Sequence, residues 1–225
     1  MYRFPPPDSV DVLLERARAI AGYPLAEVAT WLGTPTPDDL RHAKGWTGQL
    51  LEAALGAPGG SRPEPDFDAL GIELKTIPVR RDGTPRESTY VCVAPTEGEF
   101  EASWEESLVR RKLARVLWIP IAGDPGEAPG DRTVGAPTLW SPDAAETEVL
   151  AADWMMLSEL LAGGELHRIH GRLGTWLQLR PKGANAQDYA WMLDQEGTWV
   201  RAVPYGFYLR ARFTGRIVGG GAESS

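Results

Sequence analysis

The chain has 225 residues, 43% of them hydrophobic, and a formal net charge of −8. This length fits one domain, or two lobes that share a core, and leaves no room for a third independent unit. No apolar run reaches the roughly 18–20 residues of a membrane span. The N-terminus lacks the layout of a secretory signal, and the single Cys92 excludes an internal disulfide. We therefore expect a soluble cytoplasmic protein without a membrane partner.

A net negative charge argues against binding to nucleic acid. The basic and acidic residues, however, are concentrated in different parts of the chain. From Arg168 to Arg216 there are eight Arg or Lys residues and three acids, a local charge of +5. The local field at a binding face matters more than the total charge. A DNA-binding face on this acidic chain is therefore allowed, although a basic run can also be a merely solvated surface.

The spacing of apolar residues predicts an alternation of helices and strands. Helices are expected over about residues 9–22, 25–32, 47–55, 104–113, 142–161 and 185–193. Strands are expected over about residues 71–78, 88–94, 116–121, 175–179, 198–203 and 206–209. The Asp82-Gly83 pair is a hairpin signal between the first two strands. Together these elements predict a mixed α/β fold with a central sheet, in which residues 1–8 and 219–225 are flexible.

Three residues in and before the first predicted strand carry candidate chemistry. Period-two alternation places Glu73 and Lys75 on the same face of the strand at residues 71–78. An exposed ion pair is the ordinary interpretation of such a Glu-x-Lys motif. Asp66 precedes Glu73 by seven residues, close enough for a turn to bring the two carboxylates together. The sequence thus permits a cluster of two acids and one lysine.

Hydrolysis of a phosphodiester bond needs this combination of residues. Mg²⁺ prefers oxygen ligands and keeps several waters. Asp66 and Glu73 could hold the ion, with the backbone carbonyl of Leu74 as a third ligand. The metal would polarise the phosphate and activate a water, and Lys75 would orient that water and stabilise the added negative charge. Glu52, in the helix at 47–55, is a fourth candidate, although by spacing alone a solvent-facing glutamate is the more ordinary interpretation.

Several longer blocks of sequence carry a family resemblance. They are Lys44-Gly45-Trp46 with Leu50-Leu51-Glu52, Pro65-Asp66-Phe67, Ala69 to Pro78, Tyr90 to Pro95, Arg115 to Pro120, Leu139 to Pro142, Gln178 to Lys182, Ala184 to Ala186, and Gly206 to Leu209. In these blocks the chain resembles the MutH family of mismatch-repair endonucleases, from about Gly22 to Phe213. The resemblance implies a single restriction-endonuclease-like domain over residues 1–225, with a central mixed sheet flanked by helices and two lobes around a DNA cleft.

The resemblance also implies an activity and its partners. It implies Mg²⁺-dependent nicking of the unmethylated strand of double-stranded DNA at hemimethylated GATC sites. The activator would be a MutL-like protein, with MutS upstream, and the enzyme would act as a monomer.

The resemblance assigns roles to individual residues. Glu52, Asp66, Glu73 and Lys75 match the metal and catalytic set, and Lys44 and Gly45 match positions that contact the DNA backbone. Arg180, Pro181 and Lys182 match the base-reading segment, and Tyr208 with Arg180 matches positions that sense adenine methylation. An arginine or lysine can donate to guanine in the major groove, and a methyl on adenine N6 is read by contact.

Two alternative functions stay open from the sequence alone. The first is a stand-alone type II restriction endonuclease that cuts GATC sites. The second is a catalytically inactive DNA-binding scaffold for repair proteins. The intact Asp66, Glu73 and Lys75 argue against the scaffold, because clustered acids that face phosphate serve no purpose in simple binding. The glycine-rich ending from Gly219 and the segment 123–132 differ from the family pattern.

Overall fold

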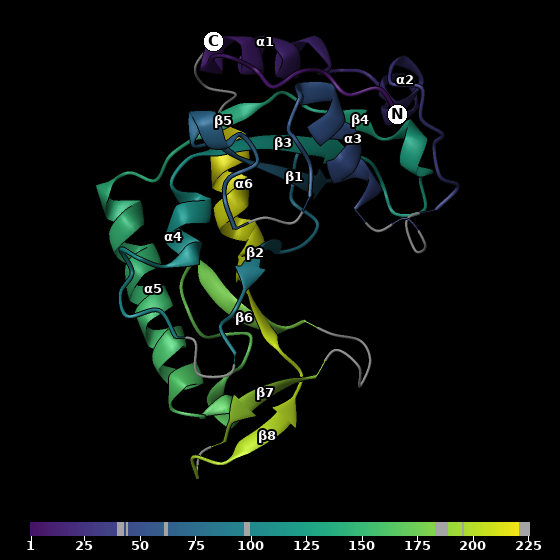
Figure 1. Cartoon of the computed structure of the whole chain (residues 1–225). Helices are drawn as coiled ribbons and strands as arrows, with labels where there is room; N and C mark the ends of the chain where they lie inside the picture. The colour runs from purple at the N-terminus through teal and green to yellow at the C-terminus, as the bar shows by residue number, and fades with distance from the viewer. Residues whose placement is uncertain are drawn as a thin grey trace. The chain divides into compact units, whose positions relative to one another are not determined.

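The structure, a computed structural model, describes residues 1–39, 43, 45–60, 63–96, 100–182, 189–194 and 196–220. These residues form a mixed α/β fold, as the sequence predicts (Figure 1). The chain divides into two compact units. Unit 1 comprises Met1–Arg86, Ala114–Ser141 and Gly215–Ser225, and unit 2 comprises Glu87–Leu113 and Pro142–Thr214.

Unit 1 contains a four-stranded mixed sheet. Strands β1 (Glu73–Val79) and β3 (Val116–Ala122) are parallel, with Lys75 opposite Trp118. The other edge of β3 pairs antiparallel with β4 (Thr133–Val134) and with β5 (Thr138–Trp140). β1 therefore forms one side of this sheet, and its other edge is available to the segment that precedes it.

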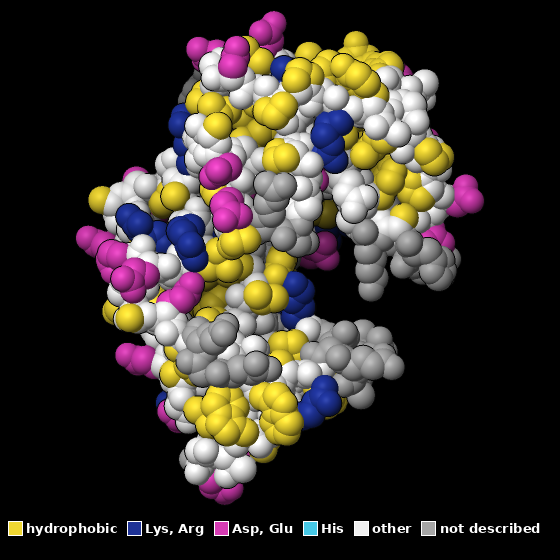
Figure 2. Space-filling model, viewed as in Figure 1, with side chains coloured by type: hydrophobic (Ala, Val, Ile, Leu, Met, Phe, Trp, Pro, Cys, Tyr) yellow, Lys and Arg dark blue, Asp and Glu magenta, His cyan; other side chains and the backbone are white. Residues whose placement is uncertain are grey.

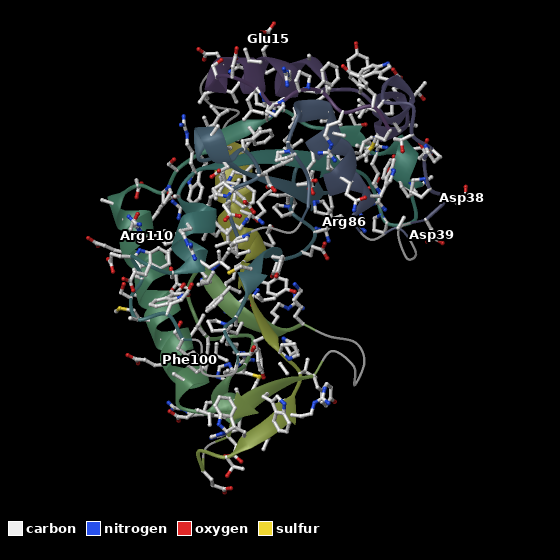
Figure 3. All side chains as sticks on the ribbon, viewed as in Figure 1. Glu15, Asp38, Asp39, Arg86, Phe100 and Arg110 are labelled. Atoms are coloured by element: carbon white, nitrogen blue, oxygen red, sulfur yellow. The ribbon has the colours of Figure 1, made fainter. Side chains whose placement is uncertain are left out.

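Three helices pack against this sheet: α1 (Val10–Ala19), α2 (Leu25–Trp31) and α3 (Trp46–Leu55) (Figure 1). The Ser9 side chain caps α1, because its Oγ accepts from the backbone N of Val12 at 3.3 Å. Glu15 points outward from α1 (Figure 3). The inward face belongs to a core of buried residues from the three helices and the sheet, which includes Leu13, Leu25, Val28, Leu50, Leu51, Leu55, Ile72, Leu74, Leu117 and Ile119.

Unit 2 contains an antiparallel sheet in the order β2 (Thr89–Val93), β9 (Tyr205–Leu209), β6 (Leu177–Pro181). A hairpin of β7 (Ala190–Leu193) and β8 (Trp199–Ala202) lies in the same unit. Helix α5 (Ala144–Ala162) packs on β6 and begins with a capping box between Asp143 and Glu146. Helix α4 (Leu108–Leu113) packs on β2.

The remaining elements are the short 3₁₀ helices η1 (Asp68–Leu70), η2 (Pro129–Asp131) and η3 (Leu166–Arg168), and the C-terminal helix α6 (Ala211–Gly220). The sequence did not predict α6, which is strongly amphipathic, with Phe213 and Ile217 buried. The flexibility expected from residue 219 stays a prediction: α6 reaches Gly220, and residues 221–225 lie outside the described residues.

Three sequence-based expectations are wrong in detail. The turn at Asp82-Gly83 forms, with Arg80 N donating to Thr84 O at 2.9 Å, but β1 pairs with β3 and β2 with β9 instead of with each other. The expected helix at 185–193 is a strand over its described part, because Met192 is buried while its neighbour Trp191 is exposed, a period of two. Helix α4 begins at Leu108 and not near residue 104.

A further observation concerns membranes. None of the helices in the described part of the chain combines the length and the apolar character that a membrane crossing requires.

Candidate active site and nucleic-acid interface

A backbone hydrogen bond pattern brings Asp66 to the outer edge of β1. Glu73 N donates to Arg115 O at 3.0 Å, so the Glu73 backbone faces β3. Strand residues alternate in the direction of their backbone groups, and the backbone of Leu74 therefore faces the opposite edge. There Leu74 N donates to Asp66 Oδ2 at 2.8 Å. The carbonyl of Leu74 is directed to the same edge as the Asp66 carboxylate.

A tight turn connects Asp66 to strand β1. Phe67 and Ile72 exchange two backbone hydrogen bonds, of 2.9 and 3.2 Å. Between them lie η1 and Gly71, whose φ of 63° is a left-handed value that suits glycine. The interval between Asp66 and Glu73 is therefore spanned by a small closed loop, as the sequence suggested.

Glu73 and Lys75 lie together on one face of β1. Lys75 Nζ is 2.8 Å from Glu73 Oε1, and Glu73 is only 4% exposed. The same face of the neighbouring strand β3 carries the fully buried Trp118, opposite Lys75. Burial of an ionised carboxylate is costly unless a cation is paired with it. The pair is thus a buried ion pair and not the exposed one that a Glu-x-Lys motif ordinarily forms.

Glu52 of α3 lies within electrostatic reach of both acids. Burial raises the pKa of Glu52 above its usual value, and the charge of Asp66 raises it further, as Glu73 does to a smaller extent. The Arg3 guanidinium acts in the opposite direction. Like charges raise a carboxyl pKa only when they lie close to it. Three acids from three different segments of unit 1 therefore share one electrostatic environment.

This donor set fits a hard divalent cation. Among the described residues, no three His, Cys, Asp or Glu side chains converge into a group that could hold a metal ion on their own. Mg²⁺, however, is held in many sites by only one or two carboxylates, with waters completing its octahedron. Asp66, Glu73 and the outward carbonyl of Leu74 supply two carboxylates and one carbonyl at the edge of β1. The residues present therefore fit a magnesium ion.

A surface depression lies beside Asp66. Its volume is about 260 Å³, and it is lined by Pro58, Gly59, Gly60, Glu64, Pro65, Asp66 and Asp68. The lining comes from the segment that connects α3 to β1. This depression leaves solvent access to the Asp66 side of the site.

A second cluster occupies one face of the sheet in unit 2. Cross-strand partners share a face, and Gln178 pairs with Tyr208 while Arg180 pairs with Gly206. The Arg180 guanidinium lies 5.8 Å from the centre of the Tyr208 ring. Arg180, Pro181 and Lys182 are exposed. The structure thus brings the sequence-predicted Arg180 and Tyr208 together at the end of β6.

Tyr90 on β2 belongs to the same cluster, and sequence reasoning missed it. Its ring lies 5.3 Å from that of Tyr208, edge to face, and Lys182 Nζ donates to its hydroxyl at 2.6 Å. Burial raises the pKa of Tyr90 well above its usual range, so the phenol stays neutral. The signal was present in the alternation of the strand at 88–94, but the partner strand was not predictable from it.

Gly206 makes room for the two tyrosine rings. A Cβ at this position would lie 3.1 Å from Tyr90 Cε2 and 3.1 Å from Tyr208 Cε2. These distances are tighter than ordinary contacts, so a side chain here would displace the rings. The absence of a side chain at residue 206 is therefore part of the geometry of this cluster.

The two backbone-contact candidates are only partly described. Lys44 lies outside the described residues. Gly45 is the N-cap of α3 with a φ of 86°, and its carbonyl accepts from Gln49 N at 3.0 Å. Glycine suits this left-handed position.

Comparison with known proteins identifies the family. A family model described as "DNA mismatch repair enzyme MutH" matches residues 55–153. A DNA mismatch repair protein MutH from Klebsiella pneumoniae subsp. pneumoniae is 50% identical over 213 residues, which is 95% of this chain and 92% of the relative. The chain belongs to the MutH family. A MutH protein from Shewanella baltica, 45% identical, covers 97% of this chain and 98% of its own length.

Membership of the MutH family confirms the resemblance drawn from the sequence blocks. The matched segment 55–153 contains Asp66, Glu73 and Lys75, while the relatives cover nearly the whole chain. The roles of the individual site residues remain predictions. The contacts of these residues show which atoms each role would involve.

Proposed function

We propose that this MutH-family chain is a Mg²⁺-dependent endonuclease of DNA mismatch repair that nicks the unmethylated strand at hemimethylated GATC sites. The observation that carries the proposal is the meeting of Asp66, Glu73 and Lys75 at β1, with the Asp66 carboxylate bound to Leu74 N at 2.8 Å and the Glu73 carboxylate bound to Lys75 Nζ at 2.8 Å. Two acids and one lysine arranged around an accessible strand edge fit phosphodiester hydrolysis better than simple binding.

In the proposed reaction, the candidate residues of unit 1 have different roles. Asp66, Glu73 and the carbonyl of Leu74 would hold Mg²⁺, which when bound polarises the phosphate and lowers the pKa of a coordinated water. Lys75 Nζ, held by Glu73, donates a hydrogen bond to the attacking water and to the phosphate oxygen on which charge develops. Glu52 contributes a further carboxylate within electrostatic reach of Asp66 and Glu73.

The residues of unit 2 supply recognition. Arg180 and Lys182 donate to base edges, and Tyr208 contacts the adenine N6 position where a methyl group would collide. Tyr90 holds Lys182 by its hydroxyl and supports Tyr208 by its ring. Pro181 and the backbone at Gly45, with Lys44, complete the proposed DNA contacts. The two units would form the two lobes of one restriction-endonuclease-like domain, with double-stranded DNA between them.

The relatives are named as mismatch repair proteins, and on that basis we propose the same pathway here. A MutL-like protein would activate nicking, with MutS acting upstream, and the enzyme would work as a monomer because a single-strand nick needs one active site.

A strand-resolved nicking assay tests the proposal. Duplexes with one GATC site, each strand carrying its own label, are prepared unmethylated, hemimethylated and fully methylated, with a GATC-free duplex as control. Each is incubated with Mg²⁺, Ca²⁺ or EDTA, with and without the MutL-like partner. We expect nicking of the unmethylated strand only, with Mg²⁺, and stimulation by the partner.

Other outcomes would redirect the assignment. Cleavage of both strands without the partner would indicate a restriction enzyme. Tight, GATC-specific binding with no cleavage under any condition would contradict the nuclease proposal and favour a scaffold.

A further inference from the structure

The N-terminal segment is held against the helices of unit 1 by hydrogen bonds. Tyr2 N donates to Leu32 O at 2.6 Å, and Phe4 N donates to Ala53 O at 3.0 Å. Arg16 of α1 donates from Nη1 to Pro5 O at 2.7 Å and to Leu55 O at 3.1 Å. These bonds place Tyr2 at the end of α2 and residues 4–5 along the C-terminal half of α3, the helix that carries Glu52.

The side chain of Arg3 extends from this segment to the point where the chain leaves α3. Its Nη1 donates to the carbonyl oxygen of Ala57, two residues beyond the last residue of the helix. Its guanidinium also lies against Gly59, where an added Cβ would be 2.8 Å from Nη2 and 3.0 Å from Nη1. A cation at this end of the helix is also favoured by the helix dipole.

The backbone that Arg3 holds leads directly into the candidate metal site. Pro58, Gly59 and Gly60 line the same depression as Asp66. The charge of Arg3 is felt by Glu52, because the guanidinium opposes the rise in pKa that burial and Asp66 cause there. One side chain therefore touches the wall of the depression and lies within electrostatic reach of Glu52.

We propose that Arg3 is a positioning residue for the active site: its guanidinium fixes Ala57 and Gly59 and so holds the wall of the depression beside the Asp66 carboxylate. The inference deepens the proposed nuclease function and rests on it for the kinetic readout. Arg3 does not touch DNA or the metal in this scheme. It acts through the geometry of Asp66.

The test compares Arg3→Gln, Arg3→Lys and the control Arg18→Gln. Arg18 lies exposed in the last turn of α1, so its loss removes the same charge from the same unit without touching residues 57–59. Lysine keeps the positive charge of Arg3 but lacks the planar guanidinium, which can donate two hydrogen bonds side by side. Three quantities are measured: Mn²⁺ affinity of the DNA-free protein by paramagnetic resonance, amide hydrogen exchange of peptides covering 57–66, and single-turnover nicking with its KM for DNA.

For Arg3→Gln we expect Mn²⁺ affinity and nicking rate to fall on the order of 10-fold, as for other residues that orient metal ligands. The KM for DNA stays unchanged, exchange rises only in the peptides at 57–66, and Arg3→Lys recovers part of the loss. Arg18→Gln behaves as the wild type. Unchanged Mn²⁺ affinity and rate in Arg3→Gln would overturn the proposal, and so would tighter Mn²⁺ binding, which removal of a charge alone would produce.

The three measurements distinguish a failure of this inference from a failure of the proposed nuclease function. If the wild type binds Mn²⁺ but nicks no DNA, the nuclease proposal fails, while Mn²⁺ affinity and hydrogen exchange still decide the role of Arg3. If Arg3→Gln does not fold, the same comparison is made between Arg3→Lys and the wild type, where a loss in Mn²⁺ affinity supports the proposal and its absence overturns it.

Discussion

Lys75 Nζ lies 2.8 Å from Glu73 Oε1, two residues apart on one face of β1, where Glu73 is almost fully buried. This pairing has two consequences. It makes burial of the Glu73 charge tolerable, and it holds the lysine beside a carboxylate that is proposed to bind Mg²⁺. The same ion pair therefore serves stability and chemistry, and a substitution of either residue is expected to affect both.

Replacement of Lys75 by alanine should abolish nicking and lower stability. We expect the nicking rate to fall by about 10³-fold because the donor to the developing charge is lost. DNA affinity, measured in Ca²⁺, should be retained. Glu73 is left buried without its lysine, which should cost about 3 kcal/mol in the free energy of unfolding. Arg80→Ala, an exposed charge just after β1, is the control and should change neither quantity. Full nicking by Lys75→Ala would remove the lysine from the mechanism.

Glu52 should give the site a characteristic dependence on pH. Its pKa is raised in the folded state by burial and by Asp66. A raised carboxyl pKa means that the protonated form stabilises the fold below the usual value of 4.5, and that this contribution is lost as the pH rises through the folded-state pKa. Above its folded-state pKa the ionised Glu52 therefore destabilises the protein.

Replacement of Glu52 by glutamine tests this dependence. We expect a higher Tm than the wild type at pH 7 in EDTA, with the difference disappearing below about pH 4.5, where Glu52 is protonated in both states. Nicking should fall by about 10²-fold. Thermal unfolding of both proteins from pH 4 to pH 8 measures the effect. A Tm difference that is constant over this range would show that Glu52 is not perturbed as described.

Tyr208 should control discrimination between methylated and unmethylated sites. For Tyr208→Ala we expect the ratio of nicking rates on unmethylated and fully methylated duplexes to fall by about 10-fold, which is about 1.4 kcal/mol and lies at the lower end of the roughly 1–3 kcal/mol that one good base contact contributes to discrimination. Tyr205→Ala is the control, because residue 205 lies on the opposite face of β9 from residue 208. Equal discrimination in the wild type and Tyr208→Ala would count against the assignment of Tyr208.

Asp153 should be a determinant of the stability of unit 2. This buried carboxylate of α5 accepts from the backbone N of Thr175, Trp176 and Leu177, at 2.7, 2.7 and 2.9 Å. Asparagine would replace one acceptor oxygen by an NH₂ group and leave amide donors unsatisfied. We expect Asp153→Asn to cost about 3 kcal/mol in urea unfolding, since each bond to a charged group contributes about 1.5–3 kcal/mol.

A matched control lies on the same helix. Asp143→Asn retains a good N-cap for α5 and should change the free energy of unfolding by no more than a few tenths of a kcal/mol. If the two substitutions were equally costly, the three-amide contact of Asp153 would not be the source of the loss.

Local sequence patterns predicted most of the elements but not their partners. The apolar spacing in α1 and the helix starts expected near residues 9 and 142 are properties of a few neighbouring residues, and the structure confirms them, with Ser9 and Asp143 as the N-caps. The predicted hairpin between β1 and β2 is wrong because the turn at Asp82-Gly83 is local, whereas strand pairing depends on where β3 and β9 lie. The strand β7 was predicted as helix because a short apolar run fits either period.

The residues of the candidate site were predictable from the sequence to different degrees. Asp66, Glu73 and Lys75 could be selected from the sequence because seven residues and a turn are enough to bring two carboxylates to one strand. Glu52 could not be selected by spacing, since its approach to them depends on the packing of α3 against the sheet. Tyr90 was missed because its neighbours Tyr208 and Lys182 lie more than 90 residues away in the chain.

The sequence by itself determined the family of this protein, its mixed α/β class and the motif of Asp66, Glu73 and Lys75. Each of these depends only on contiguous blocks of sequence or on the spacing of residues that are close together in the chain. The tertiary structure alone decided that Glu73 is buried with Lys75, that Arg3 reaches the end of α3, and that Tyr90 joins Tyr208 and Lys182. These relationships depend on which segments pack together. That choice follows from the burial of apolar surface over the whole chain, which no local pattern specifies.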